Sequence, residues 1–538
     1  MTVKRGRKSI VKIKSTFGNL IIMSYTLSRR TMLKTVGAAS IATLIWPKHG
    51  FARPGGTLVL RSYGDLQVLD PAYRVSEPDA DIARCIFSGL VTRKAGDDWG
   101  WQPMGASSID QLDDKTIRFT LRDDIQFSDG FGQATAEDVK FSIERIADPK
   151  LDSPYKDDWA LLDHVEVKDK LSGLIHLKKP FAPLWNSTLP GTSGIILSKK
   201  GVEAVGGRFE TTPPGQSGPY LLKEWRPKQR TILEINPDWK GDKPAYDRIE
   251  ILPIEDAASA ERAFEAGDLD FTIASSGSVS RLRNNLPDNA RLIEKPPLSY
   301  VWLGINQDAE PFNDPKVRRA MQHAIDREMV VDAYTLGGAE ISYGIIAPGL
   351  PGNRDYVRYD YDPEKAKQLI DEAGGINIPI SIDILATSEY LAAAQIIQAN
   401  LAAIGIDLKI NQHDSGSFWS IGSEEAGETW KTMQMYITRF SMEPDPSWAT
   451  LWFVPEQVGI WNWERWNSPE FGRLHEEGIV EFDRAKRDHI YKQMQDLMDE
   501  SGCYIFLTHE VRGILTRRDV EPGLTPAGTV LYPAFRKA

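Results

Sequence analysis

The stretch PISIDILATSEYLAAAQIIQANLAAIGIDLKI, residues 379–410, carries the clearest information on the fold. Residues 379–386 alternate along the chain as a strand does, and residues 390–403 have the character of a helix that Gly405 ends. Residues 406–410 are again extended. A strand, a helix and a second strand in this order form a βαβ unit with parallel strands. The sequence therefore predicts an α/β protein.

Other segments extend this pattern along the chain. Residues 260–273 repeat the order helix, glycine, strand. Thr135 and Asp138 open a helix over 139–146 with a near capping box. Short alternating runs predict further strands at 56–61, 116–121, 231–235 and 248–253. The loop at 211–219 is a plausible domain boundary, so we expect an α/β protein in several pieces.

The composition excludes several classes of protein. With 538 residues the chain is long enough for three or four structural units, and 41% hydrophobic with 26% charged residues is ordinary for a soluble protein. The net charge of −11 argues against a nucleic-acid partner. Two cysteines exclude a disulfide scaffold and a four-cysteine metal site. We expect Cys85, in a helix over 82–90, and Cys503, just before a strand over 504–507, to be buried free thiols, although export would permit a disulfide.

Residues 1–52 differ from the rest of the chain. They contain ten Lys or Arg and no Asp or Glu, which leaves a net charge of −21 on the remainder. A basic region precedes the apolar run 36–46, and Gly50 and Ala52 supply small residues for cleavage after Ala52. The segment 28–34, SRRTMLK, resembles the twin-arginine signal of the Tat pathway. The apolar run is shorter than the roughly 20 residues that span a bilayer. The sequence therefore predicts a Tat-like signal peptide over 1–52 and export to the periplasm, with Met1 and Met23 both open as the start.

The sequence lacks the common catalytic motifs. It has no Gly-x-Ser-x-Gly elbow, no phosphate-binding loop and no dinucleotide fingerprint. Its eight histidines do not fall at paired metal-ligand spacing, and His475 has no second histidine four residues later. These absences disfavour an enzyme, and we expect no cofactor, no bound metal and no catalytic residues.

Four blocks of sequence, in a fixed order, carry a resemblance to a known family. They are 109–142 (from IDQLDDKTIRFTLR to TAEDVKFS), Gly218-Pro219-Tyr220 with Asn236-Pro237-Asp238-Trp239, the stretch from Asn306 to VRRAMQHAIDR at 317–327, and YDPEKA at 361–366. Together they resemble the family 5 extracellular solute-binding proteins, the peptide- and nickel-type receptors of ABC importers. The resemblance covers most of residues 56–510.

The resemblance implies a two-lobed periplasmic binding protein with a hinge and an extra subdomain inserted in lobe one. The division it implies is lobe one from 53–95, 215–304 and 505–538, the inserted subdomain from 96–214, and lobe two from 305–504. Because the chain crosses between the lobes more than once, the crossings would form a hinge. A ligand that favours the closed state shifts the population toward it, and the membrane permease would recognise that shape.

The resemblance also suggests where a ligand binds. Aligning Glu443-Pro444-Asp445 on the family pattern places Phe440 where peptide receptors have an acidic residue for the α-ammonium. A buried ammonium without a carboxylate costs several kcal/mol, so Phe440 argues against a free peptide N-terminus held in the usual way. Arg439 could instead meet an anionic group or form a structural salt bridge. The predicted ligand-binding residues are Tyr63, Asp65, Trp302, Trp419, Arg439, Phe440, Asp445 and Trp448.

Three functions are compatible with these observations. The leading one is a periplasmic receptor of an ABC importer, a monomer that captures a small organic solute of the peptide-like or modified amino acid class and delivers it to the inner-membrane permease. A metal-chelate or oligosaccharide receptor is an alternative ligand class. The others are a periplasmic hydrolase on a related scaffold, separable by turnover, and an interaction module that binds unfolded chains weakly.

Overall fold

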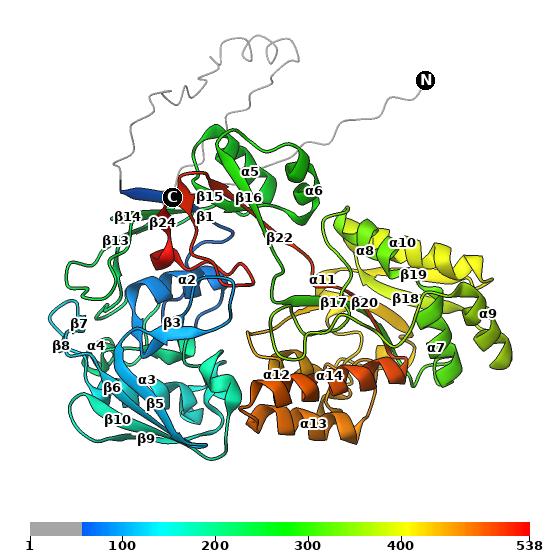
Figure 1. The fold of residues 1–538 in the computed structure, drawn as a ribbon, viewed down its shortest axis with the longest axis horizontal. Helices are drawn as coiled ribbons and strands as arrows, with labels where there is room; N and C mark the ends of the chain where they lie inside the picture. Colours follow the sequence, from blue (N-terminus) through cyan, green and yellow to red (C-terminus); the bar gives the residue numbers. More distant parts are fainter. Residues whose placement is uncertain (1–55) are drawn as a thin grey trace, which may run out of the picture. The chain divides into compact units, whose positions relative to one another are not determined.

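The computed structural model describes residues 56–538, which form one compact unit. The predicted signal segment, residues 1–52, lies outside the described residues. Within residues 56–538, no helix combines the length and the hydropathy needed to cross a membrane. Three main sheets organise this unit, and we name the parts by them: lobe one, the inserted subdomain and lobe two (Figure 1).

Lobe one is built on a seven-stranded sheet in the order β12-β13-β14-β1-β15-β22-β16. Its strands are β1 (Thr57–Ser62), β12 (Tyr220–Arg226), β13 (Arg230–Ile235), β14 (Arg248–Pro253), β15 (Phe271–Ile273), β16 (Ala290–Lys295) and β22 (Arg512–Arg517). Strand β1 is parallel to both of its neighbours, β14 and β15. The helices of this lobe are α2 (Glu77–Ile86), α5 (Ala257–Ala266) and α6 (Ser276–Asn284). The buried side chains of β1, Leu58 and Leu60, pack in a core with residues of α2.

The inserted subdomain has an antiparallel four-stranded sheet in the order β5-β6-β10-β9. Its main elements are β5 (Ala106–Asp113), β6 (Thr116–Leu121), β9 (Leu162–Val167), β10 (Ser172–Leu177), α3 (Ala136–Ala147) and α4 (Lys199–Ala204). Shorter strands are β2 (Ser88–Gly89), β3 (Val91–Arg93), β4 (Trp101–Pro103), β7 (Gln126–Phe127), β8 (Gly132–Gln133) and β11 (Ile195–Ile196). The predicted start of α3 is confirmed, because Thr135 and Asp138 form a reciprocal capping box.

Lobe two is built on a five-stranded sheet in the order β19-β18-β20-β17-β21. Its strands are β17 (Ser299–Ile305), β18 (Ile380–Leu385), β19 (Leu408–His413), β20 (Met435–Ser441) and β21 (Tyr504–Thr508). Its helices are α7 (Pro315–Ala324), α8 (Arg327–Thr335), α9 (Pro363–Glu372), α10 (Ser388–Ala403), α11 (Ser415–Phe418), α12 (Ser447–Thr450), α13 (Pro469–Val480) and α14 (Arg484–Ser501). The predicted βαβ unit is confirmed, since β18 and β19 are parallel and α10 connects them.

Both faces of the lobe-two sheet are covered. Val301 and Leu303 of β17 pack with residues of α7, α8 and α10, whereas Tyr300 and Trp302 pack on the opposite face with residues of α13 and α14. Figure 1 shows these two groups of helices on different sides of the sheet. A strand buried on both faces has a continuous apolar sequence, as β17 has.

The chain passes between the lobes at two places that lie side by side. One crossing, 296–298, joins β16 to β17, and the other, 509–511, joins β21 to β22. Ser299 donates a hydrogen bond to Glu510 at 2.8 Å, and His509 donates one to the Ser299 carbonyl at 2.9 Å. The sheets place β17 with lobe two, although the sequence-based division assigned residues up to 304 to lobe one. Pairing with β20 and β21 is long-range, so local sequence could not indicate it.

Helix α2 begins and ends earlier than the predicted helix over 82–90. Ser76 and Asp79 form a capping box that starts it, and Ser88–Gly89 pairs with β11 as a strand. Cys85 on α2 and Cys503 before β21 are both buried free thiols, as the sequence predicted. The remaining short strands, β23 (Val520–Glu521) and β24 (Arg536–Lys537), pair with each other.

Candidate ligand-binding cleft

A cavity of about 500 Å³ lies between the lobes, a volume within the usual range for small-molecule sites. Lobe one contributes residues from the end of β1, from α2 and from β22, and lobe two contributes residues from the end of β20. Pro297 and Leu298 of the first crossing also line it, and Arg512 directly follows the second crossing. Its polar lining includes Arg61, Ser62, Tyr63, Glu77, Asp81, Arg93, Ser299, Arg439, Ser441, Glu443 and Arg512.

The end of β20 lines the cavity, and its strand pairing is one-sided there. Its ladder with β17 continues to the pair of Ser299 with Ser441, whereas its ladder with β18, within the described chain, stops at the pair of Asp383 with Tyr436. Residues 438–441 therefore have a strand edge that β18 does not pair. An edge of this kind accepts an extended peptide by main-chain hydrogen bonds.

Charged groups of both signs line the cavity. Burial raises the pKa of Asp81 to about 7, although Arg84 at 2.7 Å opposes this shift. Burial lowers the pKa of Arg512, which donates a hydrogen bond to the Gly528 carbonyl at 3.0 Å. The wall is thus a set of partly desolvated charges, which suits a ligand with polar groups of its own.

Arg439 lines the cavity from lobe two and pairs with Glu510 at the second crossing, at 2.6 Å. Burial acts to lower the pKa of Arg439, but Glu510 outweighs it, and the net shift is upward. Only the Arg439 Nε takes part in this bond, so the other guanidinium N–H groups remain for further contacts. Glu510 also lines a further cavity of about 410 Å³ with Tyr334 and Glu389. The pair therefore stands between two cavities.

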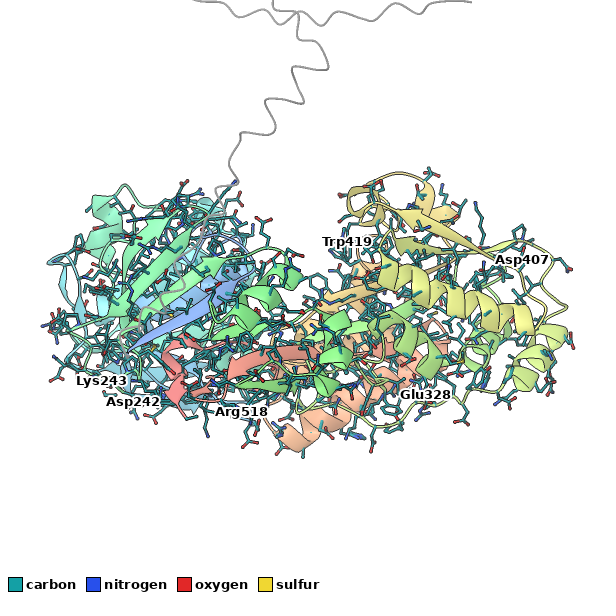
Figure 2. All side chains as sticks on the ribbon, turned by 90° about the horizontal axis from the view of Figure 1, so that it is seen from above. Asp242, Lys243, Glu328, Asp407, Trp419 and Arg518 are labelled. Carbon is teal, nitrogen blue, oxygen red and sulfur yellow. The ribbon has the colours of Figure 1, made fainter. Side chains whose placement is uncertain are left out.

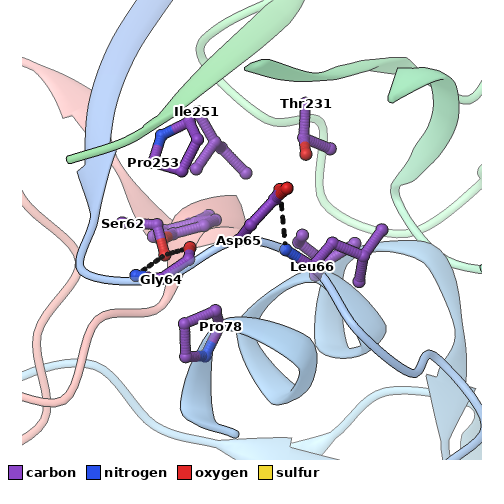
Figure 3. Close-up of a pocket in the computed structure, with 10 residues that line it drawn as sticks. Ser62, Gly64, Asp65, Leu66, Pro78, Thr231, Ile251 and Pro253 are labelled. Atoms are coloured by element: carbon purple, nitrogen blue, oxygen red, sulfur yellow. Dashed lines mark hydrogen bonds between the residues drawn. The ribbon is translucent and has the colours of Figure 1, made fainter. Parts of the chain in front are cut away.

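Two of the predicted ligand-binding residues, Tyr63 and Asp65, follow strand β1. Tyr63 lines the cavity between the lobes and is 55% exposed. Asp65 lines a small neighbouring pocket, shown in Figure 3, where it accepts a hydrogen bond from its neighbour Leu66. Asp65 also accepts bonds from the Trp225 indole at 3.0 Å and from the Lys228 backbone at 2.6 Å. Its carboxylate holds the loop after β1.

Trp302 and Asp445 lie in the packed interior of lobe two. Trp302 is 0% exposed and its indole N–H donates to Glu464 at 2.7 Å. Asp445 is also 0% exposed, and both of its oxygens accept hydrogen bonds from Arg487 at 2.8 Å. The bonds of Trp302 and Asp445 therefore lie within lobe two and stabilise the lobe that carries one side of the cleft.

Trp419, Phe440 and Trp448 lie on the lobe-two side. Trp419 is 37% exposed and lies on the side of lobe two that is turned toward lobe one in Figure 2. Phe440 packs against the rings of Trp302 and Trp419, at centroid distances of 4.9 and 6.2 Å. Because neighbouring residues of a strand point to opposite faces, Phe440 points away from the side of Arg439. Trp448 lines another cavity, of about 140 Å³.

Sequence reasoning missed several residues of the cavity wall. Arg93 and Glu443 form an ion pair of 2.8 Å although 350 residues separate them, and Glu77, Asp81 and Arg512 also line the cavity. One signal in the sequence could have pointed to Glu77 and Asp81. Ser76 followed by acidic residues marks the start of a helix, α2, that carries both. The pairing partners could not be read from spacing.

No candidate metal centre emerges within residues 56–538, where no group of three or more His, Cys, Asp or Glu side chains could hold an ion. His413, the last residue of β19, contacts Asp383 at 2.7 Å.

Comparisons with known proteins agree with this geometry. The model of the bacterial extracellular solute-binding proteins, family 5 (middle part), matches residues 100–459, more than half of the 538-residue chain. The chain is 26% identical over 509 residues to the probable D,D-dipeptide-binding periplasmic protein DdpA of Escherichia coli K12, covering 92% of this chain and 95% of that protein. Two solved structures share the fold. They are HbpA2 of Haemophilus parasuis (TM-score 0.79, 22% identity, 90% of this chain and 100% of that one) and the oligopeptide-binding protein AppA of Bacillus subtilis with a nonapeptide (TM-score 0.69, 23% identity, 90% and 99%).

Two lobes, two crossings and a cavity between them define the two-lobed fold of the periplasmic binding proteins. The chain belongs to the bacterial extracellular solute-binding proteins of family 5. It is a solute-binding receptor and not an enzyme.

Proposed function

We propose that this protein is the periplasmic receptor of an ABC importer and that it binds a peptide-like solute in the cavity between its lobes. The observation that carries the proposal is the cavity wall, which joins charged side chains of both lobes to the unpaired edge of β20 at residues 438–441. A peptide backbone supplies the N–H and C=O groups that such an edge pairs with.

The names of relatives support the ligand class. DdpA of Escherichia coli is described as D,D-dipeptide-binding and periplasmic, and AppA of Bacillus subtilis was solved with a nonapeptide. The predicted Tat-like segment at 1–52 supports export by that route. We propose a monomer that binds its solute reversibly, closes at the crossings 296–298 and 509–511, and presents the closed form to an inner-membrane permease.

The ligand-binding residues we propose are Tyr63, Arg439 and Trp419, with Glu443 and Arg512 added from the cavity wall. Tyr63 and Arg439 line the cavity from opposite lobes, so a ligand contacts both of them at once only in the closed state. Phe440 contributes to the aromatic cluster behind Trp419.

Equilibrium binding tests the proposal. We would titrate the protein with a defined mixture of di- to pentapeptides and follow tryptophan fluorescence and calorimetry. Arg439→Ala should raise the dissociation constant of the bound peptides by about tenfold, the usual scale for a hydrogen bond to a charged group. Arg473→Ala, on the exposed face of α13 with its partners Glu470 and Glu477, is the matched control and should bind normally. Unchanged affinity in Arg439→Ala would remove Arg439 from the site, and hydrolysis of the peptides would contradict a receptor.

A further inference from the structure

A smaller cavity of about 140 Å³ adjoins the cleft where lobe one, the inserted subdomain and lobe two meet. It shares Glu77, Arg93 and Glu443 with the cavity between the lobes. A ligand held in the cleft can therefore extend one group into this smaller cavity. A cavity of this size admits a group no larger than about a benzene ring. Asp158, from the short helix η2 (Lys156–Trp159) of the inserted subdomain, lines its wall, and we call it the Asp158 pocket.

The charges of the Asp158 pocket are not all paired. Arg84 bonds to Glu77, and Arg93 pairs with Glu443 at 2.8 Å. Within the described residues, Asp158 has no ion-pair partner and accepts one side-chain hydrogen bond, from the Ser193 hydroxyl.

Arg74 is the second charge of the pocket without an ion pair in the part of the chain that the structure describes. Its Nε donates to Thr192 at 2.6 Å, and its guanidinium lies 4.1 Å from the centre of the Tyr155 ring. Those two contacts orient the guanidinium. They leave its terminal N–H groups available to a ligand oxygen.

Among the described residues, no cation forms a direct ion pair with the Asp158 carboxylate. Burial raises the pKa of Asp158 to about 6, Glu443 across the pocket adds to the shift, and Ser193 and Arg74 oppose it. The group is thus largely ionised at neutral pH, with incomplete solvation. The hydroxyl of Ser187, a residue only 6% exposed, also lines the pocket and has no hydrogen-bond partner among the described residues. Buried polar groups without partners cost free energy that a polar ligand group would recover.

We propose that the Asp158 pocket binds the primary ammonium group of the ligand, with Asp158 as its counter-ion and Arg74 holding the oxygen of the adjacent carbonyl or carboxylate. This inference rests on the proposed function and specifies its ligand. An ammonium and a neighbouring carbon–oxygen group occur together at the N-terminus of a peptide and in a free amino acid. Because Asp158 belongs to the inserted subdomain and Glu443 to lobe two, a cation between them also favours the closed state.

The test uses native mass spectrometry of the full chain with an equimolar mixture of peptides and amino acids, each present with a free and with an acetylated amino group. The wild type should capture the free forms at least tenfold in preference to the acetylated ones. Asp158→Asn keeps the acceptor for Ser193 but removes the charge, and it should lose that preference. Asp157→Asn, an exposed neighbour with the same change of charge, is the control and should keep it.

The possible outcomes separate the Asp158 pocket from the proposed receptor function. Capture of free and acetylated forms alike, or a preference that survives Asp158→Asn, would overturn the Asp158 pocket and leave the receptor function standing. Capture of nothing from the mixture would overturn the proposed peptide-receptor function together with the pocket. Free amino acids captured in place of peptides would support the pocket and replace the peptide class.

Discussion

Glu464 is a single buried carboxyl that supports the aromatic wall of lobe two. It accepts hydrogen bonds from the Trp302 indole at 2.7 Å and from the Tyr436 hydroxyl at 2.6 Å. Burial raises the pKa of Glu464 to about 7, above the ordinary glutamate value of 4.5. The folded state therefore binds this proton more tightly than the unfolded state, and stability falls as the pH rises from about 4.5 to 7.

We expect Glu464→Gln to stabilise the protein at pH 8 and to change little at pH 4.5. The amide oxygen keeps both hydrogen bonds, while the cost of ionising a buried group, on the order of 1–3 kcal/mol at pH 8, disappears. Urea unfolding of both proteins across this pH range measures the difference. If Glu464→Gln gains no stability over wild type at pH 8, the raised pKa of Glu464 does not control this pH dependence.

His475, another single buried residue, gives the opposite pH dependence of stability. Burial lowers its pKa to about 4 from 6.5, and its Nδ1 lies 2.8 Å from the Thr450 hydroxyl. Because the unfolded state takes up the proton first, His475 destabilises the fold as the pH falls from 6.5 to about 4. In His475→Gln the unfolding free energy should fall less between pH 7 and pH 4.5 than in wild type. Equal losses would show that another group causes the acid sensitivity.

At the scale of elements, the pair of Asp445 and Arg487 fastens the segment after β20 to α14. Both side chains are buried, and each carboxylate oxygen accepts one guanidinium N–H. Removing one partner of such a pair leaves an uncompensated buried charge. The pair therefore anchors the chain directly after the cavity-lining residues 441–443 to the interior of lobe two.

Asp445→Asn should lower the free energy of unfolding by about 3 kcal/mol, the usual cost of breaking a buried ion pair. Thermal and urea unfolding measure this loss. Asp407→Asn, on an exposed residue of the same lobe labelled in Figure 2, provides the control. If Asp445→Asn unfolds like wild type but binds ligand poorly, Asp445 is a ligand contact, as the sequence had suggested.

Local patterns in the sequence predicted single helices and strands well. Strand partners and most cavity residues depend on long-range contacts, so they could not be predicted. The βαβ unit at 379–410 and the capping box at Thr135 depend on neighbours within a few residues, so both could be predicted. The place of β17 depends on strands more than 100 residues away, and its apolar sequence suits either sheet. Within the site, Tyr63 and Arg439 were found through the resemblance, whereas Asp158 and Arg93 gain their meaning only from partners in other parts of the fold.

At the scale of the whole molecule, ion pairs across the cleft stabilise the closed arrangement. Arg93 of β3 and Glu443 of lobe two form such a pair, at 2.8 Å and partly exposed. Pairs of this exposure contribute up to about 1 kcal/mol, which is about a fivefold change in the ratio of closed to open forms. This pair therefore adds only a small bias toward the closed form.

Glu443→Gln should shift the unliganded protein toward the open form. We expect a larger radius of gyration by small-angle X-ray scattering than for wild type, with unchanged thermal unfolding. Glu470→Gln removes an exposed pair with Arg473 within lobe two and should leave the scattering unchanged. Identical scattering from Glu443→Gln and wild type would show that this pair does not control closure.

The central claim is that the cleft holds a solute reversibly and leaves it unchanged. Native mass spectrometry of the mature protein, purified gently from its own cell envelope and compared with its denatured mass, tests it most directly. We expect a discrete additional mass that is lost on denaturation and regained, intact, when the released compound is added to refolded protein. A released compound that does not rebind, or that returns chemically altered, would contradict it.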